Sequence, residues 1–116
     1  MPFTSTESFG LASDKSPFEG QWFIDSAVPS DEFQRRYRLK YGREVTPGVG
    51  HAYDSVMLLV EAAQISRDRG LSLAEALQQI SNYTGVVGPL SVRRDGVIWG
   101  EPSVRVIKDG KSARSL

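Results

Sequence analysis

Residues 46–70, TPGVGHAYDSVMLLVEAAQISRDRG, decide the fold of this chain. Thr46 offers a capping hydroxyl directly before Pro47, and proline suits the first helical position because its missing N–H costs nothing there. Apolar side chains then return at the helical period until Gly70 ends the pattern. The apolar positions are Val49, Ala52, Tyr53, Val56, Leu59, Val60, Ala63 and Ile65. We predict a long central helix that is apolar around most of its circumference and therefore needs partners on several sides.

Two shorter helices are predicted on either side of the long one. Ser30 can cap a helix with an acidic first turn, where carboxylates meet the positive end of the helix dipole, and Gly42 can end it. Ser72 and Glu75 form a capping box, in which the hydroxyl and the carboxylate each satisfy a backbone donor at the start of the third helix.

The strand signals lie toward the two ends of the chain. Residues 21–27 carry aromatic and β-branched side chains before a proline and predict a mostly buried strand. Residues 90–92 and 97–99 flank an Asp-Gly pair, which favours a hairpin because these residues tolerate the positive φ of a tight turn. Residues 103–107 predict a last strand that ends at Asp109-Gly110.

Length and composition limit the chain to one modest core. It has 116 residues, of which 40% are hydrophobic and 24% charged, and this composition is globular. We predict an irregular segment over 1–20, a single α/β core over 21–111 with three helices packed on a small sheet, and a tail over 112–116. The order of strand, three helices, hairpin and strand is unusual for a free-standing domain and indicates part of a larger fold.

Charge and rare residue types exclude several classes of function. Fourteen basic and fourteen acidic side chains give a net charge of zero, which argues against a nucleic-acid or membrane-surface protein. The sequence has no cysteine and one histidine, His51, so we expect no metal site, no cofactor and no catalytic residues. The first ten residues lack the cationic start and apolar run of a secretory signal, and no apolar stretch is long enough to cross a membrane.

Some features suggest function but have a plainer interpretation. Basic residues after Ser30 are typical of a solvated helix face, although a phosphate or nucleic-acid patch is the alternative. Residues 85–88 contain two glycines but lack the lysine and hydroxyl of a phosphate-binding loop, so we predict a turn. Glu61 is not accompanied by a second acid or base at a catalytic spacing, so we expect it at a solvated edge or paired with a basic side chain. Trp22 and Trp99 lie in strand-like segments, where sheet packing is favoured over sugar stacking.

Several short stretches, taken in order, carry a resemblance to a known family. They are FEGQWF (18–23), KYGRE (40–44), AYDSV (52–56), YTGVVGPL (83–90), RDG (94–96) and VRVIKDGK (104–111). This series resembles the C-terminal third of type I periplasmic binding proteins, the substrate-binding subunits of branched-chain amino acid ABC transporters and their relatives. The resemblance covers about residues 17 to 111.

The resemblance implies two α/β lobes joined by a hinge. The strand near 21–27 would leave the second lobe, the three helices would belong to the first, and the chain would cross back after Pro89. The implied function is part of an extracellular solute-binding receptor that closes on an amino acid or related small polar solute, with no enzymatic activity. For the full-length parent the resemblance implies a periplasmic or extracellular location and the membrane subunits of an ABC transporter as partners. The alternative is a fragment that self-associates as a homo-oligomer and does not bind ligand by itself.

The resemblance also implies ligand-binding positions. Glu7 is the nearest match to the acidic residue that receives a ligand's ammonium group, with an exposed loop carboxylate as the alternative. Gly48 stands where the family places an aromatic residue, so the pocket would be altered or roomier. His51, one turn further, is a candidate hydrogen-bonding partner of the ligand, with a packing role as the alternative. For Tyr53 we favour packing, and for Asp54 a surface or structural hydrogen bond.

Overall fold

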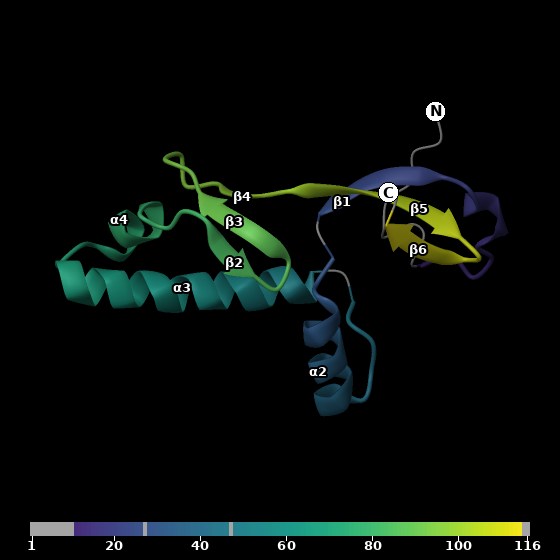
Figure 1. Ribbon diagram of the computed structural model, residues 1–116, viewed down its shortest axis with the longest axis horizontal. Helices are drawn as coiled ribbons and strands as arrows, with labels where there is room; N and C mark the ends of the chain where they lie inside the picture. Colours follow the sequence, from purple (N-terminus) through teal and green to yellow (C-terminus); the bar gives the residue numbers. More distant parts are fainter. Residues whose placement is uncertain (1–10, 27, 47, 115–116) are drawn as a thin grey trace. The chain divides into compact units, whose positions relative to one another are not determined.

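The computed structural model describes residues 11–26, 28–46 and 48–114, and Figure 1 shows their helices and strands. The chain divides into two compact units. The first contains the described residues before Val28 and from Pro102 onward, and the second contains the described residues of Val28–Glu101. The sequence predicts a single core over 21–111, but the strands near the two ends of that range pair with each other while the residues between them form a separate core.

The first unit is a three-stranded antiparallel sheet with the order β1-β5-β6. Its elements are the 3-10 turn η1 (Ser16–Phe18) and the strands β1 (Trp22–Ser26), β5 (Pro102–Lys108) and β6 (Lys111–Arg114). Phe23 and Ile107 are buried together, and Phe18 packs against them. Both strands predicted here are present. The expectation that 21–27 is mostly buried is wrong, because side chains alternate between the two faces of the sheet: Phe23 is buried, whereas Trp22 is 46% and Ile24 62% exposed.

Strand β6 lies where the sequence predicts a tail over 112–116. Asp109 and Gly110 both take positive φ, 53° and 68°, and reverse the chain so that β6 pairs with β5. The Glu19 carboxylate accepts hydrogen bonds from the backbone N–H groups of both turn residues, at 2.9 Å and 3.3 Å. The turn signal was visible in the sequence, but the short polar strand after it forms because β5 supplies its partner.

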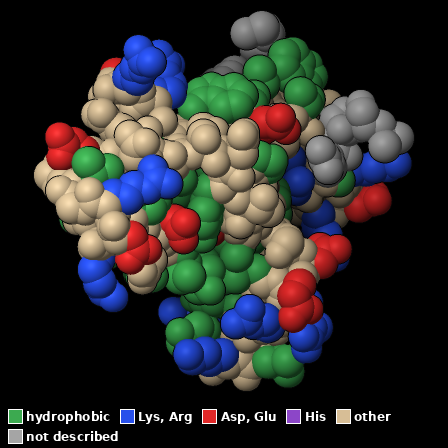
Figure 2. Space-filling model, turned by 60° about the vertical axis from the view of Figure 1, so that its left-hand side comes forward, with side chains coloured by type: hydrophobic (Ala, Val, Ile, Leu, Met, Phe, Trp, Pro, Cys, Tyr) green, Lys and Arg blue, Asp and Glu red, His purple; other side chains and the backbone are tan. Residues whose placement is uncertain are grey.

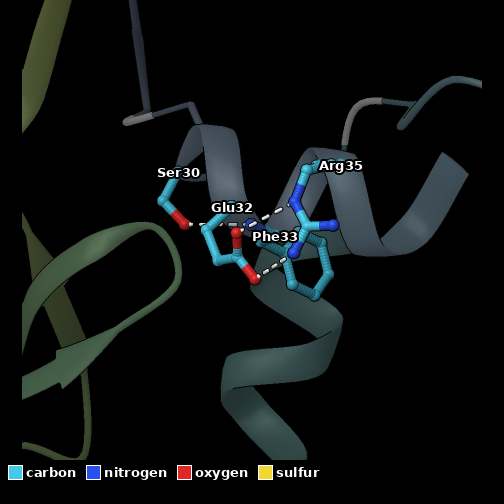
Figure 3. A network of polar contacts seen from close by, with 4 residues as sticks. All are labelled: Ser30, Glu32, Phe33 and Arg35. Atoms are coloured by element: carbon cyan, nitrogen blue, oxygen red, sulfur yellow. Dashed lines mark hydrogen bonds and ion pairs between the residues drawn. The ribbon is translucent and has the colours of Figure 1, made fainter. Parts of the chain in front are cut away.

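The second unit contains the three predicted helices, α2 (Asp31–Tyr41), α3 (Val49–Arg69) and α4 (Leu73–Gln78). The Ser30 hydroxyl caps α2 by accepting a hydrogen bond from the Phe33 N–H at 3.3 Å, and Glu32 pairs with Arg35 one turn later (Figure 3). The capping box at the start of α4 is present, with both of its hydrogen bonds made. These local predictions are confirmed.

The predicted start of α3 is wrong by two residues. The helix begins at Val49, and Gly48 is its N-cap with a left-handed φ of 88°. No side chain caps this end, and the Thr46 carbonyl accepts a hydrogen bond from the Val49 N–H at 3.3 Å. Thr46 therefore begins a turn that Gly48 completes, because glycine takes a positive φ without steric cost. The predicted end is confirmed, since Gly70 follows the helix with a φ of 67°.

The sheet of the second unit has the antiparallel order β2-β3-β4. Its strands are β2 (Tyr83–Gly85), β3 (Gly88–Val92) and β4 (Ile98–Gly100), and the predicted hairpin is β3 with β4. The chain therefore returns to the first unit after Glu101 and not directly after Pro89, because β3 pairs with β2 inside the unit that holds the helices.

The core of the second unit lies where the β2–β3 hairpin and α4 meet α3 (Figure 1). The buried apolar side chains of this unit are Phe33, Leu58, Ala62, Ala76, Ile80, Val87 and Leu90. The predicted fold class, α/β with three helices, is confirmed, with two small antiparallel sheets in place of one.

Candidate functional site

The start of α3 carries two of the three predicted ligand-binding residues. Gly48 is the exposed N-cap, and His51 is half-buried in the first turn. The His51 carbonyl accepts a hydrogen bond from the Ser55 hydroxyl at 2.8 Å, so this interaction involves its backbone and leaves the imidazole for other partners. Glu7 lies outside the described residues. The structure therefore brings Gly48 and His51 together and does not place Glu7 relative to them.

Asp54, one turn after His51, is the most buried acidic residue described. Its side chain is 1% exposed, and its carboxylate oxygens accept hydrogen bonds from the backbone N–H groups of Val86, at 2.8 Å, and Val87, at 3.0 Å. These residues form the two-residue turn between β2 and β3. A carboxylate suits this position because it accepts several hydrogen bonds and strengthens each of them with its charge. The structural hydrogen bond expected of Asp54 is confirmed.

Two glycines allow the start of α3 and the β2–β3 turn to pack closely together. A Cβ atom at Gly85 would overlap the Asp54 carboxylate. A Cβ atom at Gly50 would lie 2.6 Å from Pro29 Cγ and 2.8 Å from Val87 Cγ1, closer than real Cβ atoms come. The start of α3 is therefore held between the chain that enters α2 and the β2–β3 turn.

A further hydrogen bond joins the same elements. The Ser30 N–H donates to the Val86 carbonyl at 2.8 Å, so the chain before α2 is tied to the turn that Asp54 holds. We call this set of contacts, made by Pro29, Ser30, Gly50, Asp54 and 85–87, the α3 junction. Sequence reasoning identified the turn and the carboxylate separately, but their separation of more than 30 residues gave no signal that they would meet.

Tyr83 lies in β2 just before the α3 junction. Burial raises the pKa of its phenol, and the negative charges of Asp54 and Glu61 raise that pKa further. With Ile65 and residues 79–84, Glu61 also lines an open groove of about 380 Å³. Glu61 is exposed at this edge, which agrees with a solvated carboxylate.

The remaining candidates have structural or solvent-exposed positions. On α2, Arg35 pairs with Glu32 at 2.8 Å and Arg38 with Glu44 at 3.3 Å, all four on the surface, as expected of a solvated face. Trp22 and Trp99 lie in strands but remain about half exposed, so neighbouring side chains cover only part of each ring. Within the described ranges no cluster of His, Cys, Asp and Glu side chains could hold a metal ion. No helix in the described part of the chain is long and apolar enough to span a membrane.

Solved structures of solute-binding proteins share this fold. A leucine binding protein, LivK, from Thermotoga maritima matches 87% of this chain with a TM-score of 0.71 and 23% identity. An ABC transporter substrate-binding protein from Desulfitobacterium hafniense, in complex with Leu, matches 84% with a TM-score of 0.72 and 23% identity. Another from the same organism matches 84% with a TM-score of 0.70 and 26% identity.

The match covers only part of these proteins. It spans 31%, 32% and 31% of the three chains, respectively. No protein-family model and no curated protein matches this sequence significantly. The expected resemblance to branched-chain amino acid binding proteins is confirmed at the level of fold, over about a third of their length.

Proposed function

Because this chain has the fold of about a third of a branched-chain amino acid ABC transporter substrate-binding protein, we propose that it forms part of a solute receptor. The receptor holds an amino acid or related small polar solute by closing two lobes, and it works with the membrane subunits of an ABC transporter outside the cytoplasm. The observation that carries this proposal is the fold match, with TM-scores of 0.70 to 0.72 over at least 84% of the chain. The matched proteins are substrate-binding proteins, which supports a role without catalysis.

The start of α3 gives the proposal a chemical basis. The first N–H groups of a helix have no intrahelical partner and lie at the positive end of the helix dipole, where a carboxylate is stabilised. Gly48 places no side chain over this end of a 21-residue helix. His51 supplies an imidazole in the first turn, and Glu7 is proposed to pair with the ammonium group of the solute. Each charged end of an amino acid would then have a partner.

Thermal unfolding with a panel of amino acids, amides and small carboxylates tests the proposal. The chain is measured alone and in a mixture with the Desulfitobacterium hafniense protein of 26% identity from which the matched region has been removed. Each sample is measured at two protein concentrations. A solute present at 100 times its dissociation constant adds about 2.7 kcal/mol to stability. We expect a solute-specific rise in the unfolding temperature, and no rise with any solute in either sample would refute solute binding.

Two variants and a matched control locate the site. Glu7→Gln and His51→Ala are expected to reduce the solute-induced rise. Gln64→Ala changes an exposed residue nearly four turns further along α3 and should leave the rise unchanged. If the solute-induced rise in unfolding temperature were the same in all three variants, the solute would bind elsewhere.

A second candidate is self-association without ligand binding. Val97, Ile98 and Trp99 are consecutive apolar residues, each about half exposed, at and just before β4. In the described sheet β4 is an edge strand, and exposed apolar edges are prone to pair with other chains. This candidate would be favoured if the unfolding temperature rose with protein concentration and did not change with any solute.

A further inference from the structure

Helix α3 has a second apolar face that the described residues of the second unit leave exposed. Its first face, at Gly50, Asp54, Leu58 and Ala62, is buried in that unit. On the opposite side lie Ala52, Val56, Leu59, Val60 and Ala63, which we call the α3 stripe. All five are exposed, with Val56 at 60%, Leu59 at 47% and Val60 at 57%. A helix that is apolar on two opposite sides is typical of one packed between two layers.

The chemistry of the α3 stripe indicates the kind of surface it fits. At 3.6 residues per turn its side chains share one side of the helix, and Glu61 lies on the other side. The stripe contains no charge and no hydrogen-bonding side chain, and alanine and valine predominate. Apolar side chains reach the surface among charged ones (Figure 2). The stripe therefore fits a flat, uncharged apolar surface.

The comparison of lengths identifies a source for that surface. The matched substrate-binding proteins contain more than twice as much additional chain as the part that this protein covers. A second copy is a poorer fit, because stable interfaces engage about 20–30 residues on each side and the stripe offers five. A partner that continues the same fold would add contacts beyond the stripe.

We propose that the α3 stripe is the docking surface for the remaining part of the two-lobed fold. This inference rests on the proposed function, because it assumes that the receptor is completed by residues outside the matched region. Docking would cover the second face of α3 and turn it into a fully buried core helix. The occupant is the complementary portion of a substrate-binding protein, which presents an uncharged apolar face.

Sedimentation velocity without any solute tests this docking. The full chain is mixed with the Desulfitobacterium hafniense protein of 26% identity from which the matched region has been removed. The removed region itself, added back as a separate chain, is the positive control. We expect a one-to-one complex with this chain, and absence of a complex when the positive control associates would overturn the proposal.

Charged substitutions test whether docking uses the α3 stripe. Val56→Lys with Val60→Lys places two charges on the stripe and should weaken the complex by about 100-fold or more, since an unpaired buried charge is costly. Leu39→Lys with Tyr41→Lys adds the same charge at exposed residues of α2 and should change affinity by less than about 3-fold, as surface substitutions usually do. Circular dichroism of each variant alone confirms that it is folded.

Three results would overturn the assignment, and none depends on solute binding. Docking that is unaffected by the stripe substitutions would place the interface elsewhere. A homodimer that these substitutions abolish, with no uptake of the complementary part, would assign the stripe to a second copy. Equal weakening by the stripe and α2 variants would indicate a general effect of charge. If the complex forms through the α3 stripe but no solute raises the unfolding temperature, the docking surface is supported and only the proposed function is rejected.

Discussion

Replacement of Asp54 by asparagine should destabilise the second unit more than the equivalent acid-to-amide replacement of Glu61 or Asp68, the other acidic residues of α3. The carboxylate accepts both N–H groups of the β2–β3 turn and is 1% exposed. Asparagine has nearly the same shape but offers one accepting oxygen and one NH₂ group. One turn N–H would therefore face a donor instead of an acceptor, and water is excluded from the site.

The contacts set the size of the effect. A hydrogen bond to a charged group contributes about 1.5–3 kcal/mol, and a buried donor left without a partner costs a similar amount. We expect Asp54→Asn to lower the free energy of unfolding by about 2 kcal/mol and Asp54→Ala, which loses both bonds, by about 4 kcal/mol. In a unit of this size each kcal/mol lowers the melting temperature by about 4–8 °C, so the asparagine variant should melt about 8–16 °C earlier.

Urea unfolding and amide hydrogen exchange check both parts of this reasoning. Exchange at the amides of Val86 and Val87 should accelerate selectively, because these are the donors that lose their acceptor. Asp68→Asn is the matched control, since Asp68 is an exposed carboxylate near the end of the same helix and accepts its hydrogen bonds from the exposed Gln64 side chain. An Asp54→Asn variant within about 0.5 kcal/mol of the control, with both amides still protected, would refute the role assigned to Asp54.

Three other predictions concern the same unit. Gly85→Ala should cost about 1–3 kcal/mol, because the new methyl group overlaps the Asp54 carboxylate; urea unfolding should show a smaller cost in an Asp54→Ala background, and equal costs would contradict the overlap. The raised pKa of Tyr83 should fall in Glu61→Gln when followed by NMR titration, because a negative charge is removed. Because that pKa is higher in the folded state, the stabilisation linked to Tyr83 is complete below the unfolded pKa near 10 and is lost as pH rises through the folded-state pKa, which unfolding at alkaline pH checks. Ser72→Ala should lower the free energy of unfolding by about 1 kcal/mol, because it removes the N-cap of α4. Ser72→Thr should retain most of the stabilisation from the cap, and equal melting temperatures for the two variants would argue against the cap.

Local signals in the sequence predicted local structure well. The caps at Ser30 and Ser72 and the helix ends at Gly42 and Gly70 depend on backbone groups within a few residues, so the pattern contains the whole interaction. The start of α3 was misplaced because the Thr46-Pro47 pattern also fits a turn, and the positive φ of Gly48 decides between the two.

Features that depend on distant partners were predicted only in part. The sequence indicated a structural hydrogen bond at Asp54, but it gave no indication that Val86 and Val87 are the donors, because tertiary folding alone brings them together. Strand β6 was missed for the same reason, since four residues without apolar alternation become a strand only beside β5. The candidate site followed from a resemblance, and the structure places Gly48 and His51 on one helix end.

The structure shows a contrast between how the start of α3 is held and how the rest of α3 is covered. Gly50 is pressed between Pro29 and Val87, and Asp54 holds the turn beside it, so Gly48 and His51 are positioned by contacts within this chain. The α3 stripe, which begins at Ala52 directly after His51, is left exposed by the described residues of the second unit. Ligand sites bury about 70–90% of a small ligand, which two residues at one helix end do not achieve. In the proposed site Gly48 and His51 supply one wall, so docking of the remaining fold should precede tight solute binding. We therefore expect the solute-induced rise in unfolding temperature to be larger in the mixture than in the chain alone, and an equal rise in both would show that the site is complete without docking.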